Sequence, residues 1–221
     1  MKVCTDACLF GAWSANKFLS YRPNAKNILD IGTGTGLLTL MLAQKIDANF
    51  FAVEMDQPSS SQALQNFKAS PWRDKILLQT INILNLESEI KFECIICNPP
   101  FYENDLASPH QNKNAAMHSS ELNFSQLLNA MHKHLEVHGV ASVLVPFARE
   151  AHFEARVLQS GFYLSEKMQV RQTPQHPFFR SMYLLSLTRL KDVKSAMEIK
   201  STANDYSIEF RALLKNYYLA F

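Results

Sequence analysis

A four-residue motif, Asn98-Pro99-Pro100-Phe101, directly follows the apolar run at residues 92–97 and carries groups suited to chemistry on a planar amine. Two consecutive prolines end a strand because neither can donate to a sheet ladder, so the asparagine is held at the strand's end. An exocyclic amine is a poor nucleophile while its lone pair is delocalised into the ring. The side-chain carbonyl of Asn98 and the backbone carbonyl of Pro99 could accept its two N–H groups and localise that lone pair. Phe101 could stack on the ring, so these four residues are the predicted catalytic set.

Three of the chain's six glycines, Gly32, Gly34 and Gly36, lie together in the segment DIGTGTG between an apolar strand and a helix. Alternating glycines let the backbone turn tightly and let a ligand approach the main chain. The spacing G-x-G-x-G differs from the dinucleotide fingerprint G-x-G-x-x-G, because position 37 is leucine. Asp30, just before the turn, suits a ligand with an ammonium group better than one with phosphates. The pattern therefore favours S-adenosylmethionine over a nicotinamide cofactor.

Two further polar residues follow neighbouring strands. Glu54 lies 22 residues after Gly32, where its carboxylate could accept both hydroxyls of a ribose. Asn82 follows the third strand and could either bind the adenine edge or serve as a simple turn residue. The fourth strand of such a sheet lies beside the first, so Asn98, about 66 residues beyond the glycine turn, is expected to border the cofactor as well.

Strands alternate with helices through residue 160, which is typical of βαβ units and a parallel sheet covered on both faces. The predicted strands are residues 28–31, 48–54, 75–81, 92–97, 140–147, 163–171 and 179–190. The predicted helices are residues 37–46, 58–70, 123–135, 149–161 and 207–221, with Gly139 and Gly161 as the stops of the third and fourth. The last two strands have no long helix between them, so they are expected to pair antiparallel. The sequence thus predicts one α/β domain over residues 1–221, with a mostly parallel seven-stranded sheet and an antiparallel last strand.

Composition excludes several classes of protein. The chain has 221 residues and is 47% hydrophobic, so one domain can bury a full core. No apolar run approaches the roughly 18 residues that span a bilayer, so no membrane partner is expected and the cytoplasm is the expected location. Cys94 and Cys97, three apart on a strand, should point to opposite faces, which favours reduced core thiols over a metal or redox site. No metal is expected. The net charge of +2 is too small to indicate nucleic acid by itself.

With LDIGTGTGLL, AVE and NPPF in that order, the chain resembles the class I S-adenosylmethionine-dependent N-methyltransferases, which have a Rossmann-like fold. Its opening, MKVCTDACLFGAW, is similar to the K-V-x-T-D-x-x-L-x-G-A-W start of the bacterial tRNA1(Val) (adenine(37)-N6)-methyltransferase family. The segment EFRALLKNYYLAF resembles the end of that family. The resemblance covers nearly the whole chain. It implies methylation of N6 of adenosine 37 in a valine tRNA, with the tRNA anticodon loop as the partner.

The resemblance also implies roles for residues outside the central motifs. Thr5 and Asp6 match an element near the methionine end of the cofactor, within a cofactor-covering segment at residues 1–22. Helix capping is the alternative for both residues. His118 matches an Ala-Arg-His element expected to contact substrate, although Met117 stands where the family has arginine.

The remaining substrate contacts are predicted from side-chain type. Tyr102 lies beside Phe101, and Arg180 belongs to a local basic cluster with Arg171 and His176, for which plain solvated surface is the alternative. A helical tail is expected at residues 203–221, where the aromatic end NYYLAF could cover the domain's own sheet or a partner. The oligomeric state stays open, with a monomer favoured.

Other functions remain in competition with methylation of adenine N6. Guanine N2 in ribosomal RNA and a glutamine amide in a protein are alternative acceptors, because an Asn-Pro-Pro motif serves each of these amines. A NAD-dependent dehydrogenase would bind nicotinamide, which Leu37 and the NPPF turn oppose. A non-catalytic RNA-binding module would tolerate the loss of Asn98.

Overall fold

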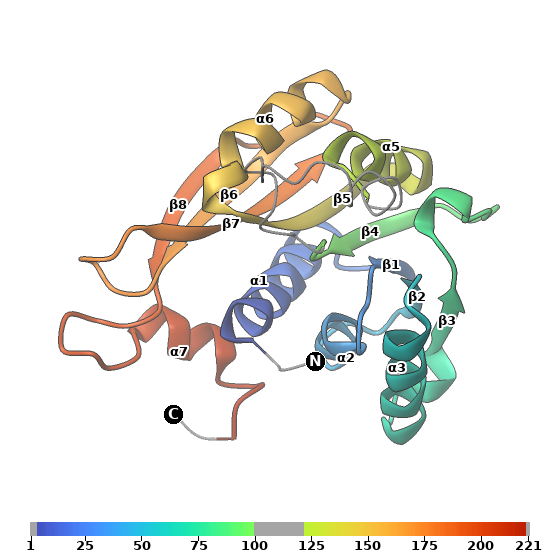
Figure 1. Cartoon of the computed structure of the whole chain (residues 1–221), viewed down its shortest axis with the longest axis horizontal. Coiled ribbons are helices and arrows are strands. Elements are labelled where there is room, and N and C mark those ends of the chain that lie inside the picture. The colour runs from blue at the N-terminus through green and yellow to red at the C-terminus, as the bar shows by residue number, and fades with distance from the viewer. Residues whose placement is uncertain (1–3, 100–121, 220–221) are drawn as a thin grey trace, which may run out of the picture.

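Within the described residues, 4–99 and 122–219, eight strands form one sheet in the order β3-β2-β1-β4-β5-β7-β6-β8 (Figure 1). The strands of this computed structural model are β1 (Asn27–Ile31), β2 (Asn49–Glu54), β3 (Ile76–Thr80), β4 (Phe92–Cys97), β5 (Leu135–Pro146), β6 (Tyr163–Arg171), β7 (Phe178–Ser186) and β8 (Val193–Glu198). The helices are α1 (Thr5–Tyr21), α2 (Leu37–Ala43), α3 (Gln57–Ala69), α5 (Phe124–His134), α6 (Glu150–Gln159) and α7 (Ile208–Leu214). Short 3₁₀ turns are η1 (Arg73–Lys75), η2 (Ile83–Asn85) and η4 (Phe147–Arg149). The predicted mostly parallel, Rossmann-like α/β fold is confirmed.

The sheet separates two hydrophobic cores. One core joins α1, α2 and α7 to one face of the sheet, and the other joins α5 and α6 to the opposite face. Figure 1 shows these two groups of helices on opposite sides of the strands. Cys94 belongs to the first core and Cys97 to the second, and both are buried free thiols, so the prediction that they face opposite ways is confirmed.

Local signals in the sequence explain where two of the helices begin. Asp56 is the N-cap of α3, where its carboxylate accepts from the Ser59 N–H at 2.9 Å. A capping box starts α5, because Asn123 accepts from the Gln126 N–H at 2.9 Å and the Gln126 side chain accepts from the Asn123 N–H at 3.1 Å. As predicted, Gly161 follows α6 with a left-handed φ of +80°.

Two predictions about the second half of the chain are wrong. Gly139 is not the stop of α5, because the helix ends at His134 and β5 begins at the next residue, so the glycine lies inside a strand. The sheet has eight described strands instead of seven, because β8 pairs with the outer edge of β6. The predicted antiparallel pairing of the strands at residues 163–171 and 179–190 is confirmed, since β7 runs opposite to β6 and also to β5, and the additional strand β8 is parallel to β6. Four of the six residues of β8 are exposed, so backbone pairing with β6 holds it in place more than burial does.

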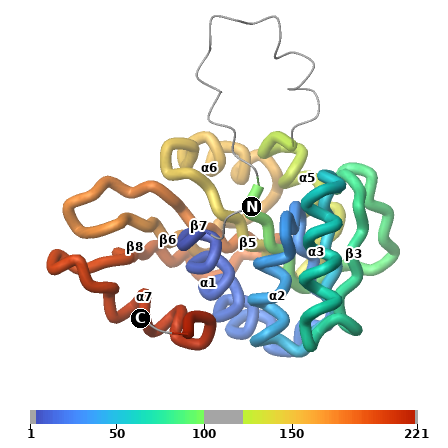
Figure 2. Tube along the Cα trace, turned by 60° about the horizontal axis from the view of Figure 1, so that its bottom comes forward, coloured from blue at the N-terminus to red at the C-terminus, as the bar shows by residue number. Residues whose placement is uncertain are grey.

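The C-terminal tail packs against its own domain. The helix α7 is shorter than predicted and lies beside α1 (Figure 2). Beyond it, the Tyr217 hydroxyl donates to the Met41 carbonyl at 3.2 Å, and Gln44 Nε2 donates to the Asn216 carbonyl at 2.6 Å. The prediction offered the domain's own sheet or a partner as the surface that the aromatic tail covers; Asn216 and Tyr217 contact α2 and its C-cap in the same domain. Among the helices in residues 4–99 and 122–219, each is too short or too polar to cross a membrane.

Candidate active site

Strand register brings the glycine turn and the asparagine motif together. Ile31 of β1 pairs with Cys97 of β4 on one side and with Val53 of β2 on the other. The residues that follow these three are Gly32, Asn98 and Glu54, so the turn, the asparagine and the carboxylate leave the sheet side by side. Parallel sheets bind ligands beyond these carboxyl ends, where the strand order reverses between β1 and β4.

The glycine turn adopts a backbone conformation that other residues rarely reach. The φ angles of Gly32, Gly34 and Gly36 are +70°, +59° and +88°. The turn is tied to β2, since the N–H groups of Gly32 and Thr33 both donate to the Val53 carbonyl, at 2.8 and 3.0 Å. These three glycines were predicted from their spacing, and their geometry agrees with a turn built for close ligand approach.

Two residues of α3 support the glycine turn, and no sequence signal pointed to either. A Cβ atom on Gly36 would lie 2.4 Å from the Phe67 ring, so the ring occupies the space that a side chain would need. Asn66 Nδ2 donates to the Thr35 carbonyl at 2.8 Å. The turn is therefore held by α3 as well as by its own glycines.

Asp30 is buried beneath the turn, and one of its two carboxylate oxygens has no hydrogen-bond partner in the part of the chain that the structure describes. Its side chain is 2% exposed, and its Oδ2 accepts from the hydroxyls of Thr33 and Thr39, each at 2.7 Å. Its Oδ1 is buried and has no hydrogen-bond partner among the described residues. The pKa of Asp30 is raised to about 6, chiefly by burial and in smaller part by the nearby Glu54 carboxylate, although hydrogen bonds from Thr33 and Thr39 oppose the shift. A buried carboxylate oxygen without a donor fits a cofactor that supplies one, such as an ammonium group.

Backbone donors orient the Glu54 carboxylate. Its Oε2 accepts from the Gly34 N–H at 2.8 Å and its Oε1 from the Asp56 N–H at 2.8 Å. Each carboxylate oxygen can accept more than one hydrogen bond, so both can still accept from two neighbouring hydroxyls. The position and orientation fit the predicted ribose contact.

Asn82 makes a local bond in this structure. It is the N-cap of η2, and its Oδ1 accepts from the Leu84 N–H at 3.0 Å. The Ile81 N–H, one residue earlier, donates to the Glu54 carbonyl at 2.9 Å, so Asn82 lies at the same edge of the sheet. The turn role is thus observed, and the contact with adenine stays a prediction.

The catalytic motif is described only in its first half. Asn98 is half-buried and Pro99 is buried at the end of β4. The other predicted residues of this region, Pro100, Phe101, Tyr102 and His118, lie outside the described residues. Their roles stay predictions.

Asp6 and Arg180, predicted to contact different ligands, meet in an ion pair. Arg180 Nε donates to Asp6 Oδ2 at 2.9 Å. Arg180 pairs with Pro146 at the carboxyl end of β5, so the pair holds the first turn of α1 at the same edge as Asn98. Capping of α1 does not explain Asp6 or Thr5, since the N-cap position belongs to Cys4, whose side chain makes no cap bond. Whether Thr5 and Asp6 contact the cofactor stays a prediction.

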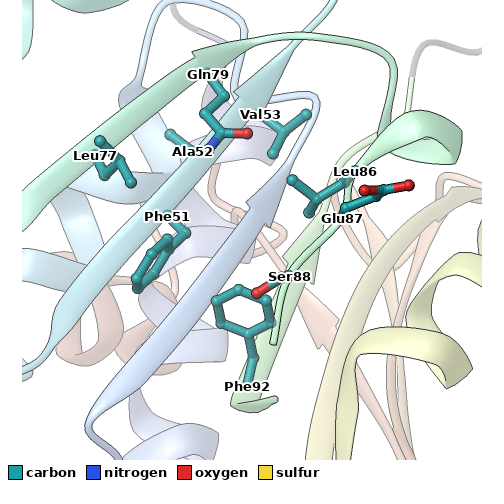
Figure 3. Close-up of a pocket in the computed structure, with 9 residues that line it drawn as sticks. All are labelled: Phe51, Ala52, Val53, Leu77, Gln79, Leu86, Glu87, Ser88 and Phe92. Carbon is teal, nitrogen blue, oxygen red and sulfur yellow. The ribbon is translucent and has the colours of Figure 1, made fainter. Parts of the chain in front are cut away.

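A small pocket elsewhere does not compete with this site. It lies over β2 and β3 (Figure 3), on the face of the sheet that shares a hydrophobic core with α5 and α6. Its lining includes Phe51, Leu77, Gln79, Leu86 and Phe92. The cavity volume is about 50 Å³, which is room for a water molecule or two and far too little for a nucleoside.

Comparisons with known proteins agree with this geometry. Residues 15–139 match the family described as methyltransferase small domain. A tRNA1(Val) (adenine(37)-N6)-methyltransferase from Pseudoalteromonas translucida is 39% identical, covering 99% of this chain and 92% of its own length. A protein of the same name from Phocaeicola vulgatus is 35% identical, covering 99% and 91%.

A solved structure from Agrobacterium tumefaciens, described as a predicted O-methyltransferase, superposes with a TM-score of 0.71 and covers 95% of each chain. At a sequence identity of 15%, this similarity is evidence for a shared fold and carries no conclusion about activity. The curated relatives are much closer, and they match the chain over almost its entire length. The chain therefore belongs to the tRNA1(Val) (adenine(37)-N6)-methyltransferase family.

Proposed function

We propose that this protein transfers a methyl group from S-adenosylmethionine to the exocyclic N6 of an adenine in tRNA, adenosine 37 of a valine tRNA by similarity to its relatives. The observation that carries the proposal is the position of Asn98. It leaves β4 directly beside the glycine turn that follows β1, where an amine and a methyl donor would meet.

The residues of the site fit the cofactor. S-adenosylmethionine is the methyl donor of this family, and it supplies a methyl group on a positively charged sulfur. Glu54 would accept from the ribose hydroxyls, and the unpartnered Oδ1 of Asp30 would accept from the ammonium group. The glycine turn would let the cofactor lie against the backbone. Asn82, Thr5 and Asp6 are further proposed contacts.

Asn98 and Pro99 would prepare the nucleophile. The Asn98 side-chain carbonyl accepts one N–H of the adenine amine, and the Pro99 carbonyl accepts the other. Two acceptors at fixed positions favour a pyramidal nitrogen, whose lone pair then points away from the ring. The proline fixes its own backbone, so the carbonyl is positioned before the substrate arrives. After transfer the nitrogen is acidic and releases its proton to water, so no general base is required.

The substrate side of the proposal rests on the relatives and on predicted residues. Phe101 would stack on the adenine, with Tyr102, His118 and Arg180 as further contacts. A base in a helical stack cannot reach such a site, so the target adenosine must be unpaired or flipped, as a nucleotide in an anticodon loop can be. We also propose that the protein acts in the cytoplasm as a monomer without a metal ion.

The domain organisation is part of the same proposal. Residues 1–221 would form a single methyltransferase domain, in which residues 1–22 cover the cofactor. Residues 203–221 would pack against the segment at residues 1–22 and hold it in place, which agrees with the contact between α7 and α1.

A labelling experiment separates tRNA from other acceptors. The protein is incubated with methyl-labelled S-adenosylmethionine and a cell extract, and RNA and protein fractions are then separated. Label in tRNA, released as N6-methyladenosine on nucleoside mass spectrometry, is the expected result. Label in ribosomal RNA as N2-methylguanosine, or in protein alone, would support one of the two alternative acceptors instead.

Replacing Asn98 by alanine tests the mechanism. We expect the turnover number to fall by at least about 100-fold, because an acceptor aimed at the transition state is lost. Cofactor affinity, measured by calorimetry with S-adenosylhomocysteine, should change little. The control is Asn85→Ala, which removes an exposed asparagine of η2 and should leave turnover at the wild-type value. An Asn98→Ala enzyme with a near-normal rate would contradict the mechanism.

A further inference from the structure

A cluster of arginine and phenylalanine side chains lies at the same edge of the sheet as Asn98. We call it the arginine–phenylalanine platform, and it consists of two neighbouring sets of contacting side chains, Phe147, Phe178 and Arg171 in one and Phe179 and Arg180 in the other. Phe147 directly follows β5, Arg171 ends β6, and the other three residues open β7. The strand β6 is parallel to β5, and β7 is antiparallel to both. These positions therefore all lie at the end of the sheet where the parallel strands have their carboxyl ends.

The platform is continuous with the active site through β5. Cys97, the residue before Asn98, pairs with Val143 of β5. The strand then continues to Pro146, which pairs with Arg180. A ligand held at Asn98 would therefore have the platform beside it, one strand away.

Rings and guanidinium groups in the platform already lie close to one another. The centroids of Phe147 and Phe178 are 5.6 Å apart with their planes at 41°. The guanidinium carbon of Arg171 lies 5.2 Å from the Phe178 centroid, and that of Arg180 lies 5.7 Å from the Phe179 centroid. All five side chains are half-buried, so each keeps part of its surface open to solvent.

Both arginine charges are compensated within the protein. Arg171 donates from Nε and Nη2 to Glu198 Oε1, at 2.9 and 2.6 Å, and from Nη1 to the Pro174 carbonyl at 3.0 Å. Arg180 donates to Asp6 as described above and to the Phe179 carbonyl at 3.2 Å. Paired in this way, the guanidinium groups offer flat faces more than net charge. Such a surface fits the faces of unpaired bases better than a phosphate backbone.

The loop between β6 and β7 adds hydrogen-bonding groups next to the platform. His176 Nδ1 lies 2.7 Å from the Thr173 hydroxyl, and the His176 N–H donates to the Thr173 carbonyl at 3.0 Å, so the loop has a defined shape. The side chains of Gln172, Gln175 and His176 are exposed there. Amide and imidazole groups of this kind can bind the edges of a splayed base.

We propose that the arginine–phenylalanine platform stacks an unpaired nucleotide that flanks the target adenine in the tRNA loop. The proposal rests on the proposed function, since it takes tRNA as the substrate. It assigns the recognition of neighbouring bases to the start of β7 and leaves the target base to the Asn98 motif.

The test measures tRNA affinity by fluorescence anisotropy for three variants and the wild-type protein. Phe178→Leu removes the ring and keeps an apolar side chain, and we expect it to weaken binding of a transcribed valine tRNA by about tenfold. Phe178→Tyr keeps the ring and should bind like the wild type. The matched control is Tyr163→Leu, which removes an aromatic residue that is 47% exposed at the opposite end of β6. Thermal unfolding and binding of S-adenosylhomocysteine verify that each variant is folded.

Salt dependence sharpens the test. If Phe178 stacks on a base, Phe178→Leu should weaken tRNA binding by the same factor at low and high salt. If the side chain acts through a phosphate contact, the loss of affinity should be smaller at high salt. If the wild type methylates tRNA and Phe178→Leu binds that tRNA within about twofold of the wild type, the platform is overturned and the proposed function stands. If the wild type methylates only protein, both the platform and the proposed methylation of tRNA are overturned. Loss of affinity in Phe178→Leu alone, with Phe178→Tyr and Tyr163→Leu unaffected, supports the platform.

Discussion

Replacing Asp30 by asparagine should change how the stability of the protein depends on pH. Burial raises the pKa of this carboxyl from 3.8 to about 6 in the folded state. Because the folded value lies above the unfolded one, the stabilisation by proton binding is fully present below about pH 3.8 and is lost as the pH rises through about 6. Asparagine carries no titrating group, so the stability of the variant does not decrease from this cause as the pH rises.

The two pKa values set the magnitude. The interval from 3.8 to about 6, at about 1.4 kcal/mol for each pH unit, gives roughly 3 kcal/mol. The unfolded carboxyl is already partly ionised at pH 4, so the free energy of unfolding of Asp30→Asn, relative to the wild type, should increase by roughly 2.4 kcal/mol between pH 4 and pH 8. The absolute difference at one pH also contains the cost of burying an amide N–H₂ group next to Thr33 and Thr39, and that cost does not vary with pH.

Urea unfolding at pH 4 and pH 8, without cofactor, measures this change. Carboxylates that do not interact with Asp30 contribute equally in both proteins, so their effects cancel in the comparison. Asp74→Asn is the matched control for exchanging a carboxyl for an amide outside the core, because the Asp74 side chain is 89% exposed. A difference for Asp30→Asn that changes by less than about 1 kcal/mol would refute the conclusion that burial dominates the environment of this carboxyl.

Three other substitutions test the cofactor site and its supports. Glu54→Gln should weaken S-adenosylhomocysteine binding by about tenfold or more in calorimetry, because a charged acceptor for two hydroxyls is lost, whereas the Gly34 N–H can still donate to the amide oxygen. Gly36→Ala should destabilise the protein by about 1–3 kcal/mol in urea unfolding, because the added Cβ meets Phe67 and φ is positive; a loss below about 0.5 kcal/mol would show that the turn adapts. Asn123→Ala should cost about 1 kcal/mol of stability through loss of the α5 capping box, with cofactor affinity unchanged.

Long-range pairing accounts for the features that sequence reasoning missed. Most residues of β8 are exposed, so its sequence lacks the alternation of apolar and polar residues that predicts a strand. Only the pairing with β6 in the folded chain identifies it as one. Gly139 is a reasonable helix stop by its type, but α5 passes into β5 without a turn because Leu135 already pairs with Phe92 of β4. After an irregularity that includes Gly139, regular pairing with β4 resumes at Val140. Asp6 and Arg180 are 174 residues apart, and nothing in either local sequence indicates that they meet.

The sequence by itself determined the parts of this protein that depend on neighbouring residues. The order of strands and helices follows from local apolar periods, the turn at DIGTGTG from its glycines, and the end of β4 from two prolines. Tertiary structure alone decided which oxygens of Asp30 and Glu54 are already bonded, that α3 supports the glycine turn, and that arginines and phenylalanines gather at the same end of the sheet as Asn98. The reason is physical: backbone conformation is set by adjacent residues, whereas burial, hydrogen-bond partners and stacking depend on segments that only the folded chain brings together.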